Sequence, residues 1–135
     1  MNTGISTRLM AAVVLTAAGW SELATAATPA QLLAQYNAQA AAPSSAERGG
    51  ILFTSRHASN WSCASCHGVQ PTGLGQHAAT GRPIQALAPA FNPERFTDAA
   101  KVEKWFRRNC KDVLGRECSA SEKADVLSWL ISLKP

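Results

Sequence analysis

Two cysteines and a histidine form the most chemically distinctive segment of this 135-residue chain. Cys63, Cys66 and His67 follow the pattern C-x-x-C-H, with two thiols three residues apart and an imidazole directly after the second. In an exported protein this spacing is typical of haem c, which binds both cysteines through thioether bonds while the histidine ligates the iron. A thioredoxin-like dithiol would need a βαβ setting and a zinc site would need a second ligand pair, and the sequence indicates neither.

The first residues provide the export signal that haem c attachment needs. A short cationic start is followed by an apolar stretch, 9–19, that is too short to span a bilayer, and by small residues with cleavage-site spacing at 24–26. We therefore expect residues 1–26 to be a secretory signal peptide and the mature protein to be periplasmic, with an uncleaved anchor as the alternative. Met1 and Met10 are the only two methionines, so the mature chain would contain none.

The composition argues against several classes of partner. With 46% hydrophobic and 16% charged residues, the chain is too apolar for a disordered polymer. The net charge of +4 comes from basic residues that are scattered along the sequence rather than gathered into dense runs. We therefore expect no nucleic-acid binding and no stable membrane insertion after signal cleavage.

The remaining chain predicts a small all-α domain without strand-like alternation. Segment 68–92 is rich in glycine and proline, so we expect a long loop wrapped around a haem, with at most short helical turns. We divide the mature chain into an Ala-rich N-terminal helix or arm, 27–43, and a cytochrome c domain, 44–135. The expected helix starts are Thr28, Ser44, Thr97–Asp98 and Ser119.

Two of these helices carry small and aromatic residues at spacings that allow a close crossing. Gly49 and Phe53 precede the haem motif, and Val126 and Trp129 lie in the last helix. This pattern resembles the crossing N- and C-terminal helices of class I cytochromes c. The resemblance implies a fold of small helices and a long loop around one covalently attached haem.

The sixth ligand of the iron is the main question that this resemblance raises. Class I cytochromes c usually take it from a methionine, which the mature chain lacks. His57 and His77 each lie ten residues from His67, in the part of the sequence near the motif rather than the part expected to cover the distal face. Lys101 and Lys104 fall on the polar side of their predicted helix.

Asn109 is the most notable candidate. It ends an otherwise apolar helical stripe formed by Val102, Trp105 and Phe106, and it lies 42 residues after His67. A buried amide needs a partner, and the iron could be that partner. The alternative is an asparagine that caps the C-terminus of the helix.

Six segments after the haem motif carry a further pattern: 77–83, 87–89, 92–98, 102–110, 116–118 and 122–125. Together they resemble the SHP (sphaeroides haem protein) type of monohaem cytochrome c. The resemblance implies that His67 is the proximal ligand, that Asn109 is a displaceable distal ligand and that Cys110 and Cys118 form a disulfide. It also implies that a dihaem or membrane cytochrome donates electrons.

These observations lead to an expected function. An amide oxygen is a hard, weak-field donor, so Asn109 should favour ferric iron and leave on reduction. A high-spin ferrous site would then bind diatomic ligands such as oxygen, nitric oxide or carbon monoxide, and the amide N–H groups could donate to them. One alternative is a simple electron carrier with His77 or His57 as a strong sixth ligand. Another is an enzyme that transforms a small molecule at the open haem, which we expect less than a ligand-binding electron-transfer protein.

The disulfide that the resemblance implies has two interpretations. It could simply stabilise the fold, as a short closed loop contributes roughly 2.5 kcal/mol in the chain-entropy model. Alternatively, because it would begin at the residue after Asn109, it could restrict how far this ligand swings.

Overall fold

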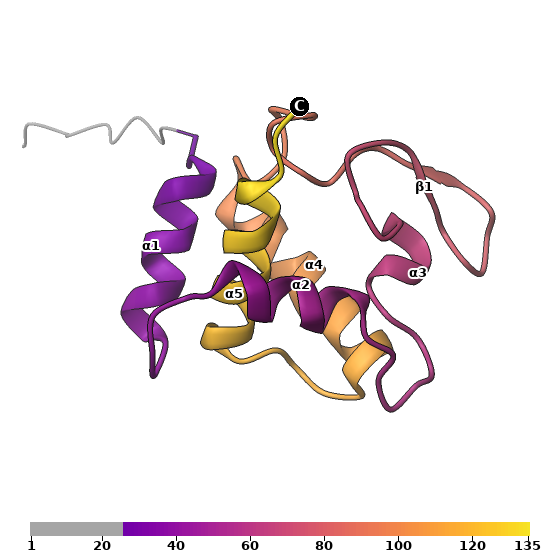
Figure 1. Ribbon diagram of the computed structural model, residues 1–135, viewed down its shortest axis with the longest axis horizontal. Helices are drawn as coiled ribbons and strands as arrows, with labels where there is room; N and C mark the ends of the chain where they lie inside the picture. The colour runs from indigo at the N-terminus through magenta and orange to yellow at the C-terminus, as the bar shows by residue number, and fades with distance from the viewer. Residues whose placement is uncertain (1–25) are drawn as a thin grey trace, which may run out of the picture.

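The computed structural model describes residues 26–135, and nearly all of the expected signal peptide, 1–26, lies outside them (Figure 1). The described chain is helical, as predicted. Among these residues, no helix has both the length and the apolar composition needed to cross a membrane. The elements are α1 (Pro29–Gln39), α2 (Ala46–Thr54), α3 (Ala64–His67), β1 (Gly75–Gln76), β2 (Pro83–Ile84), α4 (Ala99–Leu114) and α5 (Ala120–Ser132).

Most helices begin where the capping residues predicted. The Thr28 hydroxyl accepts a hydrogen bond from the backbone of Gln31 at 3.2 Å, and the Gln31 side chain accepts one from the backbone of Thr28 at 2.8 Å. Ser119 caps α5 with the same reciprocal pair, and the Asp98 carboxylate caps α4 by accepting a hydrogen bond from the backbone of Lys101. These starts are set by residues three positions apart, so they can be read from the sequence.

The predicted start of α2 is wrong by one residue. Ser45, and not Ser44, is the N-cap, and its hydroxyl accepts a hydrogen bond from the backbone of Arg48. The reason is tertiary: the backbone N–H of Ser45 donates to the Asp125 carboxylate at 2.6 Å, while that of Ser44 donates to the side chain of Asn37 at 3.1 Å. The Asp125 carboxylate, 80 positions from Ser45, and the nearer Asn37 side chain thus determine which of the adjacent serines caps the helix.

The core is organised by the crossing of α2 and α5 (Figure 1). A Cβ on Gly49 would overlap the carbonyl oxygen of Asp125 and lie 2.9 Å from the backbone nitrogen of Val126, so only glycine allows this approach. Next to the crossing, the Phe53 ring is 1% exposed and lies 4.8 Å from the Trp129 ring. The predicted crossing is therefore present, with the glycine at the point of backbone contact.

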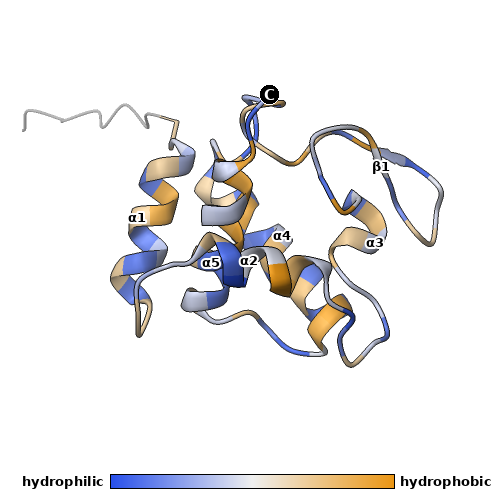
Figure 2. Ribbon diagram, in the orientation of Figure 1, coloured by the Kyte–Doolittle hydropathy of each residue, from blue (hydrophilic) through white to orange (hydrophobic). Residues whose placement is uncertain are grey.

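The Ala-rich segment 27–43 contains α1, which packs against α5 and is not a free arm (Figure 1). Leu32 and Tyr36 are 2% and 5% exposed and belong to the same hydrophobic cluster as Phe53 and Leu130. Figure 2 shows hydrophobic and hydrophilic residues alternating along α1, as a helix with one buried face requires. The helix thus contributes a hydrophobic side to the core.

The long segment between α3 and α4 is mainly irregular, as predicted, with one addition. β1 and β2 form a short antiparallel pair in which Gly75 is opposite Ile84. A Cβ on Gly75 would overlap the carbonyl oxygen of Cys66, so this glycine lets the segment approach the end of α3. The pair therefore lies directly beside the haem-attachment motif.

Glu122 predicts a specific acid sensitivity of the fold. Hydrogen bonds from Arg116, at 2.7 and 2.8 Å, are the main reason why the pKa of Glu122 falls from 4.5 to about 2. This stabilisation is present above pH 4.5 and is lost as the pH falls towards 2, because the unfolded chain takes up the proton first. Since Arg116 is largely exposed, we expect only about 1 kcal/mol. In urea unfolding, Glu122→Gln should be less stable than the parent at pH 7, and the difference should vanish near pH 2.

Glu47→Gln is the control, because Glu47 also lies in the first turn of a helix but is exposed and has no ion pair among the described residues. A stability difference for Glu122→Gln that is the same at both pH values would contradict the prediction.

Candidate haem site

The C-x-x-C-H segment forms α3, a single helical turn that begins after Cys63. Two serines secure this turn: the backbone N–H of Ser62 donates to the Ser65 hydroxyl at 3.0 Å, and the backbone N–H of Ser65 donates to the Ser62 hydroxyl at 3.1 Å. Cys63 and Cys66 are both half-buried and neither forms a disulfide. Both thiols are therefore held on one turn, which is the arrangement that two thioether bonds to one haem require.

The Cys63 thiol is unlike that of a redox-active dithiol. Burial raises its pKa to about 11, and the neighbouring Cys66 adds to this effect. Reactive dithiols depend instead on a lowered pKa that makes the thiolate available. The local chemistry therefore fits structural attachment of a cofactor better than thiol–disulfide exchange.

His67 has unused ligand capacity. Its Nδ1 is buried and has no hydrogen-bond partner among the described residues. Burial, with a smaller contribution from the positive charge of Arg95, lowers the pKa of the imidazole to about 4, so the ring is neutral at physiological pH. A neutral imidazole is the form that ligates metals, so His67 fits the role of an iron ligand. Phe53 packs beside it, with the ring centres 6.1 Å apart.

Asn109 lies inside α4 and does not cap it. The helix continues to Leu114 and ends at Gly115, which has a left-handed backbone with φ of +72° and whose N–H donates to the carbonyl of Lys111. The interpretation of Asn109 as a C-terminal cap is therefore wrong. Its side chain is half-buried and makes no hydrogen bond within residues 26–135.

The stripe that leads to Asn109 is only partly as predicted. Val102 and Phe106 are half-buried and pack against the core cluster. Trp105 is 44% exposed, and the Arg108 guanidinium lies 5.7 Å from its ring centre. We expected Trp105 to share the buried face, but α4 places it towards the edge of that face.

The two proposed iron ligands lie on elements that do not pack extensively against each other. α3 packs against α2 and β1, whereas α4 has no comparable contact with α3 in the described part of the chain. Ligands on opposite faces of a planar cofactor must come from separate elements, so this arrangement is compatible with the roles expected for His67 and Asn109.

The alternative histidine ligands serve local turns. The His57 Nε2 lies 2.8 Å from the carbonyl oxygen of Leu52, at the end of α2. The His77 Nδ1 accepts a hydrogen bond from the backbone of Thr80 at 3.2 Å. Each ring therefore has one nitrogen committed close to its own position in the chain, and Lys101 and Lys104 are exposed as expected.

Cys110 and Cys118 form a disulfide, as the resemblance implied, with their Cα atoms 5.6 Å apart. It joins α4, one residue beyond Asn109, to the segment that precedes α5. α4 is thus covalently tied near its C-terminal end.

Arg95 is a candidate site residue that sequence reasoning could not select from the six arginines that follow Arg48. Its Nε donates to the carbonyl of Ala86 at 2.9 Å and one terminal nitrogen donates to that of Gln85 at 2.8 Å, so the half-buried guanidinium is fixed in place. Its charge acts on His67, as described above. No local pattern identifies this arginine, because its partners belong to the irregular loop.

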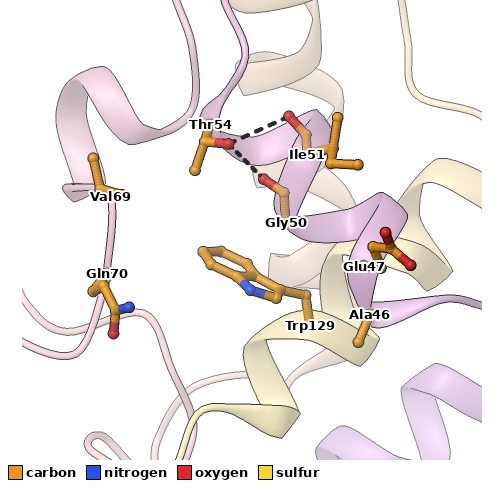
Figure 3. A pocket seen from close by; sticks show the side chains of 8 residues that line it. All are labelled: Ala46, Glu47, Gly50, Ile51, Thr54, Val69, Gln70 and Trp129. Carbon is orange, nitrogen blue, oxygen red and sulfur yellow. Dashed lines mark hydrogen bonds between the residues drawn. The ribbon is translucent and has the colours of Figure 1, made fainter.

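A surface groove of about 320 Å³ lies beside this site but does not include it. The groove runs between α2, the segment that follows His67 and the α5 residue Trp129, whose indole ring extends towards Val69 and Gln70 (Figure 3). Its other lining residues all belong to α2. None of the predicted site residues lines the groove, which is a product of the α2–α5 crossing.

Several known proteins are similar to this chain. Residues 39–130 match a family described as a domain of unknown function, DUF1924. The chain is 51% identical over 107 residues to the cytochrome c-type protein SHP of Cereibacter sphaeroides. The aligned region covers 76% of this chain and 82% of that protein. It is 47% identical over 70 residues to cytochrome c'' of Methylophilus methylotrophus. Here the aligned region covers 52% of this chain and 49% of that protein.

Solved structures agree with these sequence matches. The structure of oxidised SHP, described as an oxygen-binding cytochrome c, has a TM-score of 0.74 and 50% identity, and it covers 78% of this chain and 97% of that chain. Oxidised cytochrome c'' from Methylophilus methylotrophus has a TM-score of 0.70 and 36% identity, and it covers 79% of this chain and 95% of that chain. The fold predicted from the sequence, a small helical domain of the class I cytochrome c type, is thereby confirmed.

Proposed function

This chain belongs to the family of the cytochrome c-type protein SHP, and on that premise we propose that it is a periplasmic, ligand-binding monohaem cytochrome. Its cofactor is one covalently attached haem c, held through Cys63 and Cys66. When bound, the haem supplies an iron that changes oxidation state and exchanges its sixth ligand. The finer parts of the proposal concern what His67, Asn109 and Arg95 do around it.

Asn109 carries the proposal. A half-buried amide within α4 has no hydrogen-bond partner in the described residues, and the chain that follows the expected signal peptide offers no methionine in its place. A carboxamide oxygen is a hard, weak donor that favours ferric over ferrous iron. We therefore propose that Asn109 is a displaceable sixth ligand that withdraws on reduction, and that its N–H groups then donate to a bound diatomic ligand.

His67 and Arg95 have complementary roles in this proposal. The neutral, half-buried imidazole of His67 would be the proximal ligand, and Phe53 packs beside it. The immobilised guanidinium of Arg95 is a suitable partner for a carboxylate group of the cofactor, because two of its nitrogens are already bound and the planar group is held in one orientation.

Absorption spectra of the purified holoprotein test the proposal directly. We expect a ferrous form that is high-spin and takes up carbon monoxide at once, because no strong ligand would hold the sixth position. The ferric form, in which Asn109 is the expected ligand, provides the internal comparison. A low-spin ferrous form that does not respond to carbon monoxide would contradict the proposal and would favour an electron carrier ligated by His77 or His57.

The proposal also covers the source of the electrons and the ligand that binds the reduced haem. We propose that a dihaem or membrane cytochrome supplies the electrons and that oxygen, nitric oxide or carbon monoxide binds the reduced site. The description of SHP as an oxygen-binding cytochrome supports oxygen among these ligands. Continuous consumption of oxygen or nitric oxide under supplied electrons would instead favour the enzymatic alternative.

A further inference from the structure

Side chains, rather than close backbone packing, hold α4 in place. The backbones of α2 and α5, and of α1 and α5, approach each other extensively, but α4 has no comparable contact with any described helix. Near the C-terminal end of α4 the main link is the covalent Cys110–Cys118 disulfide, beside a hydrogen bond that the Ser59 hydroxyl donates to the carbonyl of Val113 at 2.7 Å. Near the N-terminal end it is Glu103, so Asn109 lies between the two links.

Glu103 joins α4 to two other helices at once. One carboxylate oxygen accepts a hydrogen bond from the Tyr36 hydroxyl of α1 at 2.7 Å. The other accepts one from the Lys123 ammonium of α5, also at 2.7 Å. The ammonium also lies 5.6 Å from the centre of the Tyr36 ring, so the three side chains form one connected cluster.

The same tyrosine contacts the face of α4 that carries Asn109. The Tyr36 side chain is buried, and its ring meets that of Phe106 edge-to-face, with the centres 5.9 Å apart and an interplanar angle of 89°. Phe106 precedes Asn109 by three residues, so both lie on one side of the helix. A displacement of α4 at Glu103 and Phe106 would therefore move Asn109 as well.

We propose that Tyr36 is a positioning residue, which together with Glu103 and Lys123 forms a strut that holds α4 so that Asn109 stays within reach of the haem iron. The proposal rests on the proposed role of Asn109 as the sixth ligand. It assigns a function to α1, which is separate from the haem-attachment motif. This helix would help to set how firmly Asn109 is held at the iron.

The ionisation state of Glu103 strengthens the hydrogen bonds of the strut. Burial, followed by the hydrogen bond to Glu103, raises the pKa of Tyr36 above its ordinary range. Burial opposes ionisation of Glu103, but the hydrogen bonds from Lys123 and Tyr36 outweigh it and lower the pKa of the carboxyl. At neutral pH the phenol is therefore a donor to an ionised acceptor, which is a stronger hydrogen bond than a neutral pair.

Tyr36→Phe is the sharpest test, because it removes the hydroxyl and keeps the ring against Phe106. With azide as the probe of the ferric holoprotein, we expect the dissociation constant to fall about threefold or more, since a less firmly held Asn109 competes less well. Glu103→Gln should act in the same direction. Combined with Asn109→Ala, Tyr36→Phe should have no further effect on azide binding, because the residue through which it acts is gone.

Arg48→Gln provides the matched control. Arg48 binds the buried carboxylate of Asp125 at 2.8 Å, in a contact that joins α2 to α5 and does not involve α4. This variant should lower stability in chemical unfolding but leave azide binding unchanged. If it shifts azide binding as Tyr36→Phe does, the effect is general destabilisation and the strut is refuted.

The remaining outcomes separate the strut from the proposed function. If Asn109→Ala changes the ferric spectrum but Tyr36→Phe leaves azide binding unchanged, the strut is refuted while the sixth-ligand assignment survives. If Tyr36→Phe has the same effect with and without Asn109, the strut does not act through this ligand and is likewise refuted. If Asn109→Ala itself changes neither spectrum nor azide binding, both proposals fall.

Discussion

Replacing Asn109 by Ala is expected to open the sixth position of the ferric protein while the haem stays attached. The expected thioether bonds and the expected proximal ligand come from segment 63–67, whereas Asn109 belongs to α4, so the substitution should remove one ligand without affecting attachment. The ferric absorption spectrum should change, and azide should bind at least about tenfold more tightly because it no longer has to displace a protein ligand. Carbon monoxide binding to the ferrous form should change much less, since Asn109 is expected to have withdrawn already.

Asp112→Ala is the appropriate control, since Asp112 lies on the same helix and its side chain is exposed. It should leave both spectrum and azide affinity as they are. A ferric spectrum of Asn109→Ala that is identical to that of the parent would rule out Asn109 as the ligand. In that case the alternative histidine ligands would have to be tested next, beginning with His77, whose Nε2 makes no hydrogen bond within the described residues.

The second large effect is expected at the helix crossing. Gly49→Ala should destabilise the protein by about 3 kcal/mol or more, because the new Cβ would overlap the Asp125 carbonyl and crowd the Val126 nitrogen. Both neighbours are backbone atoms of α5, so the clash cannot be relieved by a side-chain rotation. The helices would have to separate, which would loosen the contact between Phe53 and Trp129. Urea unfolding of the holoprotein, followed by far-UV circular dichroism, measures the loss.

Gly73→Ala is the matched control for this substitution. A Cβ on Gly73 has no other atom within 4 Å, and its backbone does not adopt a left-handed conformation. This variant should be nearly neutral. A loss of less than about 1 kcal/mol for Gly49→Ala would show that the crossing can relax and that the glycine is not required there.

Features that depend on near neighbours in the chain could be read from the sequence. The haem-attachment motif is five consecutive residues, and the helix starts at Thr28, Asp98 and Ser119 are set by hydrogen bonds over three positions. Gly49 could be placed at the crossing because small residues at helical spacing mark the close approach of two backbones. The irregular character of 68–92 followed from its glycines and prolines.

Where the local sequence allowed a helix to begin or end at either of two positions, the sequence alone did not determine which one is used. Ser44 and Ser45 both satisfy a capping pattern, and the Asp125 carboxylate, 80 positions away, selects the second. Likewise, Asn109 could have ended α4, but the helix continues until Gly115 can adopt the left-handed conformation that terminates it. The end of the helix therefore excluded one of the two interpretations of Asn109.

By itself, the sequence predicted haem attachment at Cys63 and Cys66, iron ligation by His67 and most of the helix starts, because residues close together in the chain specify all of these. Only the tertiary structure decided which arginine acts on His67, how far Trp105 is exposed and that Glu103 joins three helices. Tyr36 is 67 positions from Glu103, and Lys123 is 20 positions from it. No periodicity in the sequence links these residues, since their contact exists only once α1, α4 and α5 have packed together.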